Sequence, residues 1–280
     1  NIFCNKFDKK FDIQSYKTAK NIISIINKID IASIQHDILG SAYEEIAKEH
    51  STIRDFGQHF TQPPVKNMMI KLINPQVLPD GKAETCCDPA MGSGGFLITY
   101  VKYIMAQAKE KGINLDWKYI ENEGIYGQEI VPGTCQLALV NMLIYTGHTF
   151  KNIAQGDSLI NPITAKFDTI LANPPFGIKG LDYNTITRNA QIPAVQYIPV
   201  ESGIAVMLFI QEIIFMLKIN GRCAVVMPNG QELHSDNRDL LAIRELLMKT
   251  CELREIIHMP KDAFRYTNIE TCVFYFIKKR

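Results

Sequence analysis

The chain has 280 residues, of which 46% are hydrophobic and 21% are charged, a balance typical of a globular protein with one sizeable core. No apolar run approaches the roughly 18 residues that a membrane helix requires, so we expect no membrane span. The formal net charge of +1 gives no overall signature of nucleic-acid binding, so any contact with DNA needs a local basic surface or a partner.

The seven cysteines form neither a CxxC pair nor a His/Cys cluster with zinc spacing. Most of them lie in apolar, strand-like runs, including the neighbours Cys86 and Cys87. We therefore expect buried, reduced thiols, no metal site and a cytoplasmic location. The chain begins at Asn1 rather than at a methionine and has no signal-peptide pattern, so we expect a trimmed fragment.

The spacing of apolar residues divides the chain in two. Residues 15–50 have the spacing of amphipathic helices, which predicts a helical lead-in over 1–55 that is part of a truncated helical region. From about residue 64 onward, short β-rich runs alternate with longer helical stretches, a pattern typical of a parallel sheet with crossover helices. We expect a second domain over 56–280.

The expected fold is α/β, with a doubly wound, mostly parallel sheet of seven strands. The strands are predicted at 83–88, 124–129, 153–156, 167–172, 222–227, 253–258 and 271–277. The helices are predicted near 64–73, 94–110, 132–146, 203–218 and 237–250. Lys218, Asn220 and Gly221 are expected to end one helix with a cationic last turn and a turn signal.

One interval, residues 177–202, has no sustained period and is rich in Gly, Asn, Thr and Pro. Loops of this length within a compact domain are usually functional or mobile. A surface insertion is the equally weighted alternative.

A glycine-rich turn follows the first predicted strand over residues 88–96, which read DPAMGSGGF. Glycines at a strand-to-helix turn let the backbone approach a nucleotide-like ligand, although a tight connection alone would also use them. The next strand ends at Glu129, which can accept hydrogen bonds from both hydroxyls of a ribose or simply be solvated. We attribute its distance from the turn to an insertion over 103–123.

Two further strands also end in polar residues. Asp157 follows Gly156, where it can accept from the amine of an adenine ring or serve as an ordinary turn residue. The strand 167–172 runs directly into Asn173, Pro174, Pro175 and Phe176. The prolines fix the backbone, so that the Asn173 side-chain carbonyl and the Pro174 carbonyl can converge on an amine, while Phe176 offers a face for stacking a base. A strand terminator with an incidental aromatic residue is the alternative.

The order of these motifs, from Phe60-Thr61 through the glycine-rich turn to NPPF, resembles that of the amino-methyltransferases of DNA. Fuller stretches resemble the modification subunit of type I restriction-modification systems, and they lie at 37–44, 57–61, 171–177, 221–228 and 259–264. This resemblance covers roughly residues 35–280. It implies a Rossmann-like methyltransferase sheet and S-adenosylmethionine as cofactor.

The resemblance also implies roles for individual residues. Asn173, Pro174, Pro175 and Phe176 are expected to hold the target base. The residues expected to bind the cofactor are Gln58, His59, Phe60, Thr61, Gln62 and Pro63 at its methionine end, Asp88, Pro89, Gly92, Ser93, Gly94 and Gly95 along its backbone, Glu129 at its ribose and Asp157 at its adenine. The chain departs from the family at Gln62, where proline is usual, and at Met91, where cysteine is frequent.

The implied reaction is direct transfer of a methyl group from S-adenosylmethionine to N6 of a flipped adenine in double-stranded DNA. The implied partners are a separate specificity subunit and a restriction subunit. Lys179 and Arg188 are candidates for holding the strand near the flipped base. Two alternatives remain open, namely a methyltransferase acting on guanine N2 of RNA or on protein glutamine, and a non-catalytic assembly module.

Overall fold

We describe a computed structural model of the chain over residues 15–28, 61–176, 178–261, 263–264 and 269–280. The helical lead-in expected over 1–55 therefore lies largely outside the described residues, and helix α2 (Tyr16–Ile26) is its described part. Gln58, His59 and Phe60 also lie outside them. Within the described ranges, no helix combines the length and the apolarity that crossing a membrane demands.

The described residues form one sheet of seven strands in the order β3-β2-β1-β4-β5-β7-β6. The strands are β1 (Cys86–Asp88), β2 (Ile125–Glu129), β3 (Asn152–Gln155), β4 (Phe167–Ala172), β5 (Leu217–Pro228), β6 (Cys251–His258) and β7 (Thr271–Lys278). The first five pair in parallel, whereas β7 is antiparallel to both β5 and β6. The predicted α/β fold with a mostly parallel seven-stranded sheet is confirmed.

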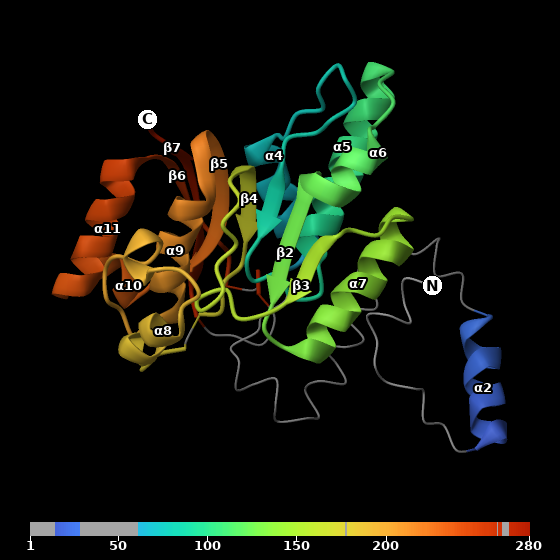
Figure 1. Cartoon of the computed structure of the whole chain (residues 1–280), viewed down its shortest axis with the longest axis horizontal. Helices are drawn as coiled ribbons and strands as arrows, with labels where there is room; N and C mark the ends of the chain where they lie inside the picture. The colour runs from blue at the N-terminus through green and yellow to red at the C-terminus, as the bar shows by residue number, and fades with distance from the viewer. Residues whose placement is uncertain (1–14, 29–60, 177, 262, 265–268) are drawn as a thin grey trace.

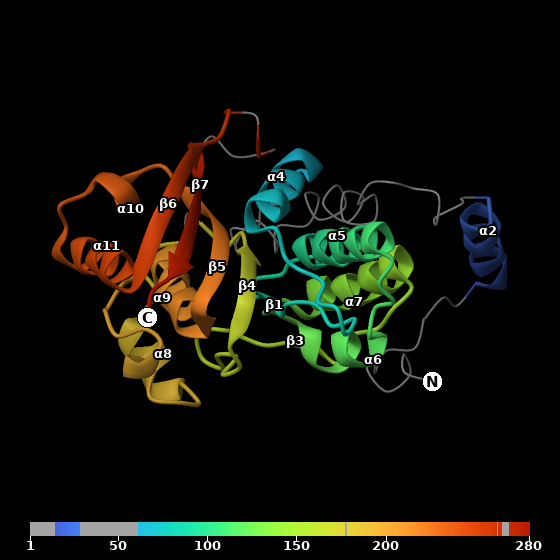
Figure 2. The same ribbon diagram turned by 90° about the horizontal axis from the view of Figure 1, so that it is seen from above.

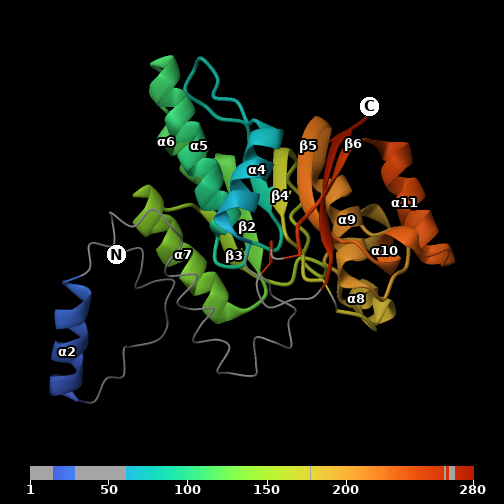
Figure 3. The same ribbon diagram turned by 180° about the vertical axis from the view of Figure 1, so that it is seen from behind.

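Helices cover both faces of this sheet (Figures 1 and 2). One face is covered by α4 (Pro63–Ile73), α5 (Gly95–Lys111) and α7 (Pro132–Thr146), and the other by α9 (Ala205–Met216) and α11 (Arg238–Thr250). Shorter helices are α6 (Trp117–Tyr119), the π-helix η3 (Ile120–Gly124), α8 (Tyr183–Asn189), the 3-10 helix η4 (Ala194–Gln196) and α10 (Gln231–His234). Helix α4 lies between α5 and β5 (Figure 3).

Neighbouring residues of the central strands point to opposite faces of the sheet. Cys86 and Leu171 pack into the core beneath α4 and α5, whereas Cys87 and Ile170 pack into the core beneath α9. Both faces of these central strands are therefore buried, as is typical of a parallel sheet with helices on both sides. The six described cysteines are buried and none forms a disulfide, as predicted. Burial raises the pKa of the Cys87 thiol.

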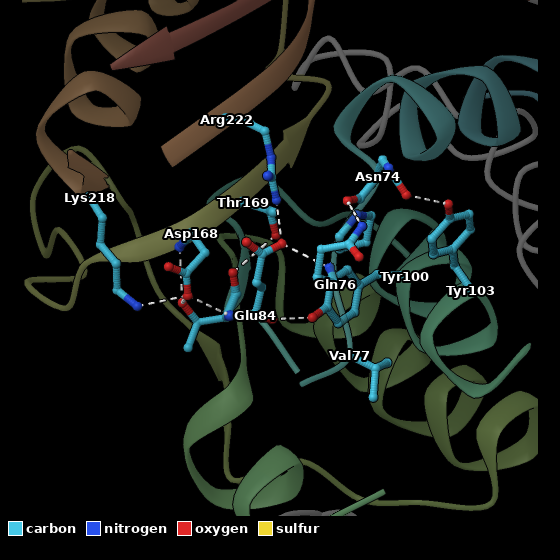
Figure 4. Close-up of polar contacts among 12 residues, drawn as sticks. Asn74, Gln76, Val77, Glu84, Tyr100, Tyr103, Asp168, Thr169, Lys218 and Arg222 are labelled. Carbon is cyan, nitrogen blue, oxygen red and sulfur yellow. Dashed lines mark hydrogen bonds and ion pairs between the residues drawn. The ribbon is translucent and has the colours of Figure 1, made fainter. Parts of the chain in front are cut away.

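The edge of the sheet where β1 and β4 begin is held by charged side chains (Figure 4). Asp168 Oδ2 accepts from Lys218 Nζ at 2.7 Å and from Thr85 N at 2.9 Å. Beside this cluster, Arg222 of β5 forms an ion pair with Glu84. These contacts join segments that precede or begin three neighbouring strands, so they stabilise the parallel register.

Two sequence predictions about connections are wrong. Helix α9 ends at Met216, and Lys218 pairs with Asp168 instead of closing that helix. Residues 103–111 are the second half of α5 rather than an insertion, and α6 with η3 completes the connection to β2.

The interval 177–202, described from residue 178, is not a structureless loop. It contains α8 and η4, and it builds a small core of its own against α9 with Ile186, Ala194, Tyr197, Ile198, Leu208 and Phe209. This core could not be predicted from the sequence, because the apolar positions of such short helices are too few to establish a period.

Candidate active site

The polar strand ends gather where the sheet changes its direction of winding. From β1 the chain continues to β2 and β3 on one side, and β4 lies on the other side of β1. Ligands of open α/β sheets bind at such a switch point, beyond the carboxyl ends of the strands. Asp88, the last residue of β1, and Asn173, which follows β4, flank this point.

Asp88 is fully buried at the centre of the site. Its Oδ1 accepts a hydrogen bond of 3.0 Å from Ala90 N, but no group of the described residues donates to its Oδ2. Burial raises the pKa of this carboxyl to about 8, against the opposing effect of the Ala90 bond, and nearby Glu129 raises it further. An unsatisfied buried acceptor of this kind is costly unless a ligand donates to it.

The turn after Asp88 packs tightly against β2. Gly94 caps α5 with φ of 83°, a left-handed conformation that favours glycine. At Gly127 in β2, a Cβ atom would lie 2.6 Å from Met91 Sδ, so this side of β2 has no room for a side chain. Met91, which stands where the family frequently has cysteine, is itself buried. An apolar side chain therefore suits this position.

Glu129 connects the end of β2 to the same turn. Its Oε2 accepts from Gly92 N at 3.1 Å and its Oε1 accepts from Val131 N at 2.9 Å. The side chain is buried. A carboxylate has about four lone-pair sites, more than the two that these hydrogen bonds occupy.

The loop after β3 is bonded directly to the turn after β1. Ser158 Oγ donates to the Pro89 carbonyl at 2.5 Å. Asp157 Oδ1 accepts from Leu159 N at 3.0 Å, which is the turn geometry that the sequence left open as the alternative. Partial burial raises the pKa of Asp157, against the lowering effect of its backbone hydrogen bonds.

Asn173 and Thr61 bring the two ends of the motif series together. Asn173 Nδ2 donates to Thr61 Oγ1 at 3.1 Å. Thr61 is placed by α4, which begins at Pro63 after the extended N-cap residue Gln62. Gln62 precedes Pro63, and the residue before a proline favours extended backbone. The turn is therefore retained although Gln62 stands where the family usually has proline.

Phe176 does not present its ring to solvent. The side chain is 2% exposed, and its ring packs edge-to-face against that of Phe264, with centroids 6.1 Å apart. The ring of Phe176 is therefore part of the protein interior in this structure. Pro174 is buried and Pro175 is partly exposed beside it.

A small pocket of about 50 Å³ opens between these groups. Its described lining comprises Thr61, Lys66, Asp88, Ala90, Met91, Gly92, Ser93, Gly95, Phe96 and Asn173. Glu129 and Asp157 are not in this lining, although Glu129 accepts a hydrogen bond from Gly92, which is part of it.

Sequence reasoning missed two residues of this site. Lys66 of α4 is a lysine that is only 7% exposed, and it lies one helical turn after Gln62, a spacing that would have identified it. Asn141 of α7 is fully buried and donates from Nδ2 to the Ser93 carbonyl at 3.1 Å. No local signal identifies Asn141, because its contact depends on the packing of α7 against the turn.

Residues 34–280 match the family described as N-6 DNA Methylase. The chain belongs to this family. Among curated relatives, the EcoEI methylase subunit of a type I restriction enzyme from Escherichia coli is 30% identical over 267 residues, which are 92% of this chain and 50% of that subunit. The motif-based resemblance to type I modification subunits is thereby confirmed. This N-6 DNA methylase chain spans about half the length of the curated relatives it matches.

Solved structures agree with this family assignment. The crystal structure of the EcoKI M protein of a type I restriction enzyme superposes with a TM-score of 0.66 at 29% identity, covering 79% of this chain and 44% of that protein. A Listeria monocytogenes protein assigned to class I S-adenosylmethionine-dependent methyltransferases gives a TM-score of 0.68 at 14% identity, covering 96% of this chain and 76% of that one. The second likeness concerns the fold alone.

Proposed function

We propose that this N-6 DNA methylase chain is the catalytic part of a type I modification subunit, and that it methylates N6 of adenine in DNA. The proposal rests on the combination of two features at the switch point. Asp88 has a buried carboxyl oxygen with no hydrogen-bond partner among the described residues, and Asn173 contacts Thr61 across this point. The proposal assigns the reaction to the domain expected over 56–280.

The residues of the site fit S-adenosylmethionine, which supplies an electrophilic methyl group. Asp88 Oδ2 is an acceptor for its ammonium group. No atom of the described residues lies within 4 Å of a Cβ built at Gly92, which leaves space for the cofactor's chain. Glu129 accepts from the ribose hydroxyls, and Asp157 lies where an adenine amine can donate. The roles of Gln58, His59 and Phe60 at the methionine end are part of the same proposal.

The side chains around Asn173 hold the target amine rather than react with it. Thr61 fixes the amide through the Asn173 Nδ2 bond, which directs the Oδ1 acceptor. The fixed acceptors of Asn173 and Pro174 stabilise positive charge that develops on the amine, and alignment supplies much of the remaining rate enhancement. Phe176 and Phe264 separate as the base enters between or beside them.

Calorimetry with S-adenosylmethionine tests the cofactor assignment. We expect a dissociation constant in the micromolar range, which corresponds to about −8 kcal/mol. Glu129→Ala should remove most of this affinity, because the residue supports both the ribose and the turn at Gly92. An unchanged isotherm for Glu129→Ala would contradict its role at the ribose.

A methylation assay tests the substrate and the partners. We propose that double-stranded DNA is the substrate, and that a separate specificity subunit, with a restriction subunit in the same system, supplies sequence choice. Near-neutral charge gives the chain little backbone affinity for DNA. The chain alone should therefore methylate duplexes poorly and gain activity with a recognition subunit. Efficient, sequence-specific formation of N6-methyladenine by the chain alone would refute the partner requirement. Preferential methylation of RNA or protein would refute the substrate.

A further inference from the structure

The loop over residues 156–161 lies at the end of β3 and carries Asp157. Its inner side is fixed by the strands of the site. Gly156 N donates to the Glu129 carbonyl at 3.0 Å, and Gln128 Nε2 donates to the Asn161 carbonyl at 3.2 Å. Together with the Ser158 contact to Pro89, these bonds place the two ends and one middle residue of the loop. The carbonyls of Leu159 and Ile160 are left for other partners.

The segment over residues 178–202 supplies those partners. Tyr197 donates from its hydroxyl to the Leu159 carbonyl at 2.6 Å. Gln191 donates from its backbone N–H to the Ile160 carbonyl at 2.9 Å. Leu159 also packs with Tyr197 in the core that this segment shares with α9. Two consecutive carbonyls of the loop are therefore held from the side opposite to β2.

The segment is itself fixed firmly enough to act as a support. Both of its ends are anchored by backbone bonds, from Leu181 N to the Gly203 carbonyl at 3.0 Å and from Ala205 N to the Ile178 carbonyl at 3.2 Å. Tyr197 is fully buried, and burial raises the pKa of its phenol to about 12. The hydroxyl therefore stays protonated, and can donate, at neutral pH. Figure 1 shows α8 of this segment beside α9.

We infer that residues 178–202 are a positioning element for the adenine end of the cofactor site, and that Tyr197 is its key positioning residue. The inference rests on the proposed function, since it takes Asp157 as the partner of the adenine amine. Each hydrogen bond to the carbonyls of Leu159 and Ile160 restricts the turn that orients the Asp157 carboxylate. The element acts on cofactor affinity through the loop and does not touch the target base.

The test compares two tyrosine variants in the full chain. Tyr197→Phe removes the bond to Leu159, whereas Tyr183→Phe removes a hydroxyl–carbonyl bond of 2.7 Å to Ile198 within the same segment. Calorimetry with S-adenosylmethionine and with adenosine should show affinity on the order of fivefold to tenfold weaker for Tyr197→Phe, as expected for one lost buried hydrogen bond. Tyr183→Phe should bind both ligands like the parent chain.

Several outcomes separate the inference from the proposed function. If the parent chain binds no S-adenosylmethionine, the proposed function fails. If the parent binds and Tyr197→Phe binds equally well, the positioning role alone is refuted. Unchanged cofactor affinity with weakened DNA affinity would instead assign the segment to DNA.

Hydrogen exchange on the parent chain provides a second measurement that needs no variant. Addition of S-adenosylmethionine should increase the protection of amides over 157–161 together with those over 191–198, and leave those over 184–189 unchanged. Protection confined to 157–161 would show that the segment does not share the cofactor's effect, and would refute the inference even if Tyr197→Phe fails to fold.

Discussion

Asn173 Nδ2 lies 3.1 Å from Thr61 Oγ1 although 112 positions separate the two residues. The contact joins the N-terminal end of α4 to the end of β4, across the point where the sheet changes winding. The amide therefore has a fixed orientation, with one side occupied by its bond to Thr61. This orientation is the basis of the first prediction.

Asn173→Ala should reduce methyl transfer by at least about 10²-fold, the loss typical of removing one fixed group that stabilises transition-state charge. Cofactor affinity should stay within about threefold, because the amide acts on the target amine. Asn173→Asp keeps an acceptor and should retain more activity than the alanine variant. Steady-state kinetics and calorimetry provide the two readouts. Equal losses of rate and cofactor binding in Asn173→Ala would place Asn173 in the cofactor site instead.

Cofactor affinity should depend on pH through Asp88. Burial raises the pKa of this carboxyl to about 8 in the free protein, so the group is largely protonated at pH 6. The ammonium group that we propose as its partner favours the ionised form, so affinity should rise from pH 6 towards pH 8, by up to about tenfold per pH unit.

The matched variant for this pH profile is Asp88→Asn. It should bind the cofactor weakly and without the slope, because the amide does not ionise. A parent chain whose affinity is flat between pH 6 and pH 8 would contradict the role of Asp88. The raised pKa also means that the contribution of Asp88 to folding stability is complete below its ordinary pKa and is lost as pH rises through about 8.

Glu212 of α9 should limit stability at neutral and alkaline pH. The side chain is fully buried, and among the described residues neither carboxyl oxygen has a hydrogen-bond partner. Burial raises the pKa of Glu212 well above its ordinary value, and nearby Asp157 raises it further. When the pKa of an acid is higher in the folded than in the unfolded state, its contribution to folding stability is complete below the unfolded pKa, here about 4.5. That contribution is lost as pH rises towards the folded-state pKa.

Glu212→Met should therefore increase the free energy of unfolding by about 1–3 kcal/mol at pH 8, and by less at pH 5. The neighbouring residue Gln211 is the control, since its amide exchanges hydrogen bonds with the backbone of Val200. Gln211→Met should destabilise the fold at both pH values. Urea unfolding at pH 5 and pH 8 measures these differences, and a Glu212→Met variant less stable than the parent at pH 8 would refute the assignment.

Asp168 should make the fold sensitive to acid. Partial burial opposes ionisation, but hydrogen bonds from Lys218 and Thr85 outweigh it and lower the pKa of Asp168. Stability from a depressed pKa is present above the unfolded pKa of about 4 and is lost as pH falls through the folded pKa. Asp168→Asn should cost about 1–3 kcal/mol at pH 7, where it breaks the charged bond to Lys218.

The difference between Asp168→Asn and the parent should shrink as pH falls below about 4. Asp80→Asn serves as the control, because Asp80 is 56% exposed in its ion pair with Lys82. Exposed pairs contribute little, so this variant should match the parent in urea unfolding. A loss of stability by Asp168→Asn that stays constant from pH 3 to pH 7 would contradict the electrostatic explanation.

The amino-acid sequence alone was enough to predict the sheet and the polar residues that lie at its edge. Residues 167–172 were predicted as a buried strand, and the strand has these bounds in the structure. Asp88, Glu129, Asp157 and Asn173 each end or directly follow a predicted strand, and parallel strands bring their carboxyl ends to one edge. These predictions succeeded because strand periodicity and the polarity of strand ends are local properties.

Only the tertiary structure decided how these strand ends relate to one another. The order β3-β2-β1-β4 sets Asp88 beside Asn173, and the packing of α4 adds Thr61 and Lys66. The same packing buries the ring of Phe176 against Phe264. Residues 178–202 lacked a period because their short helices are stabilised by α9 and the 156–161 loop rather than by their own spacing. Such contacts depend on residues distant in the chain, so no local pattern encodes them.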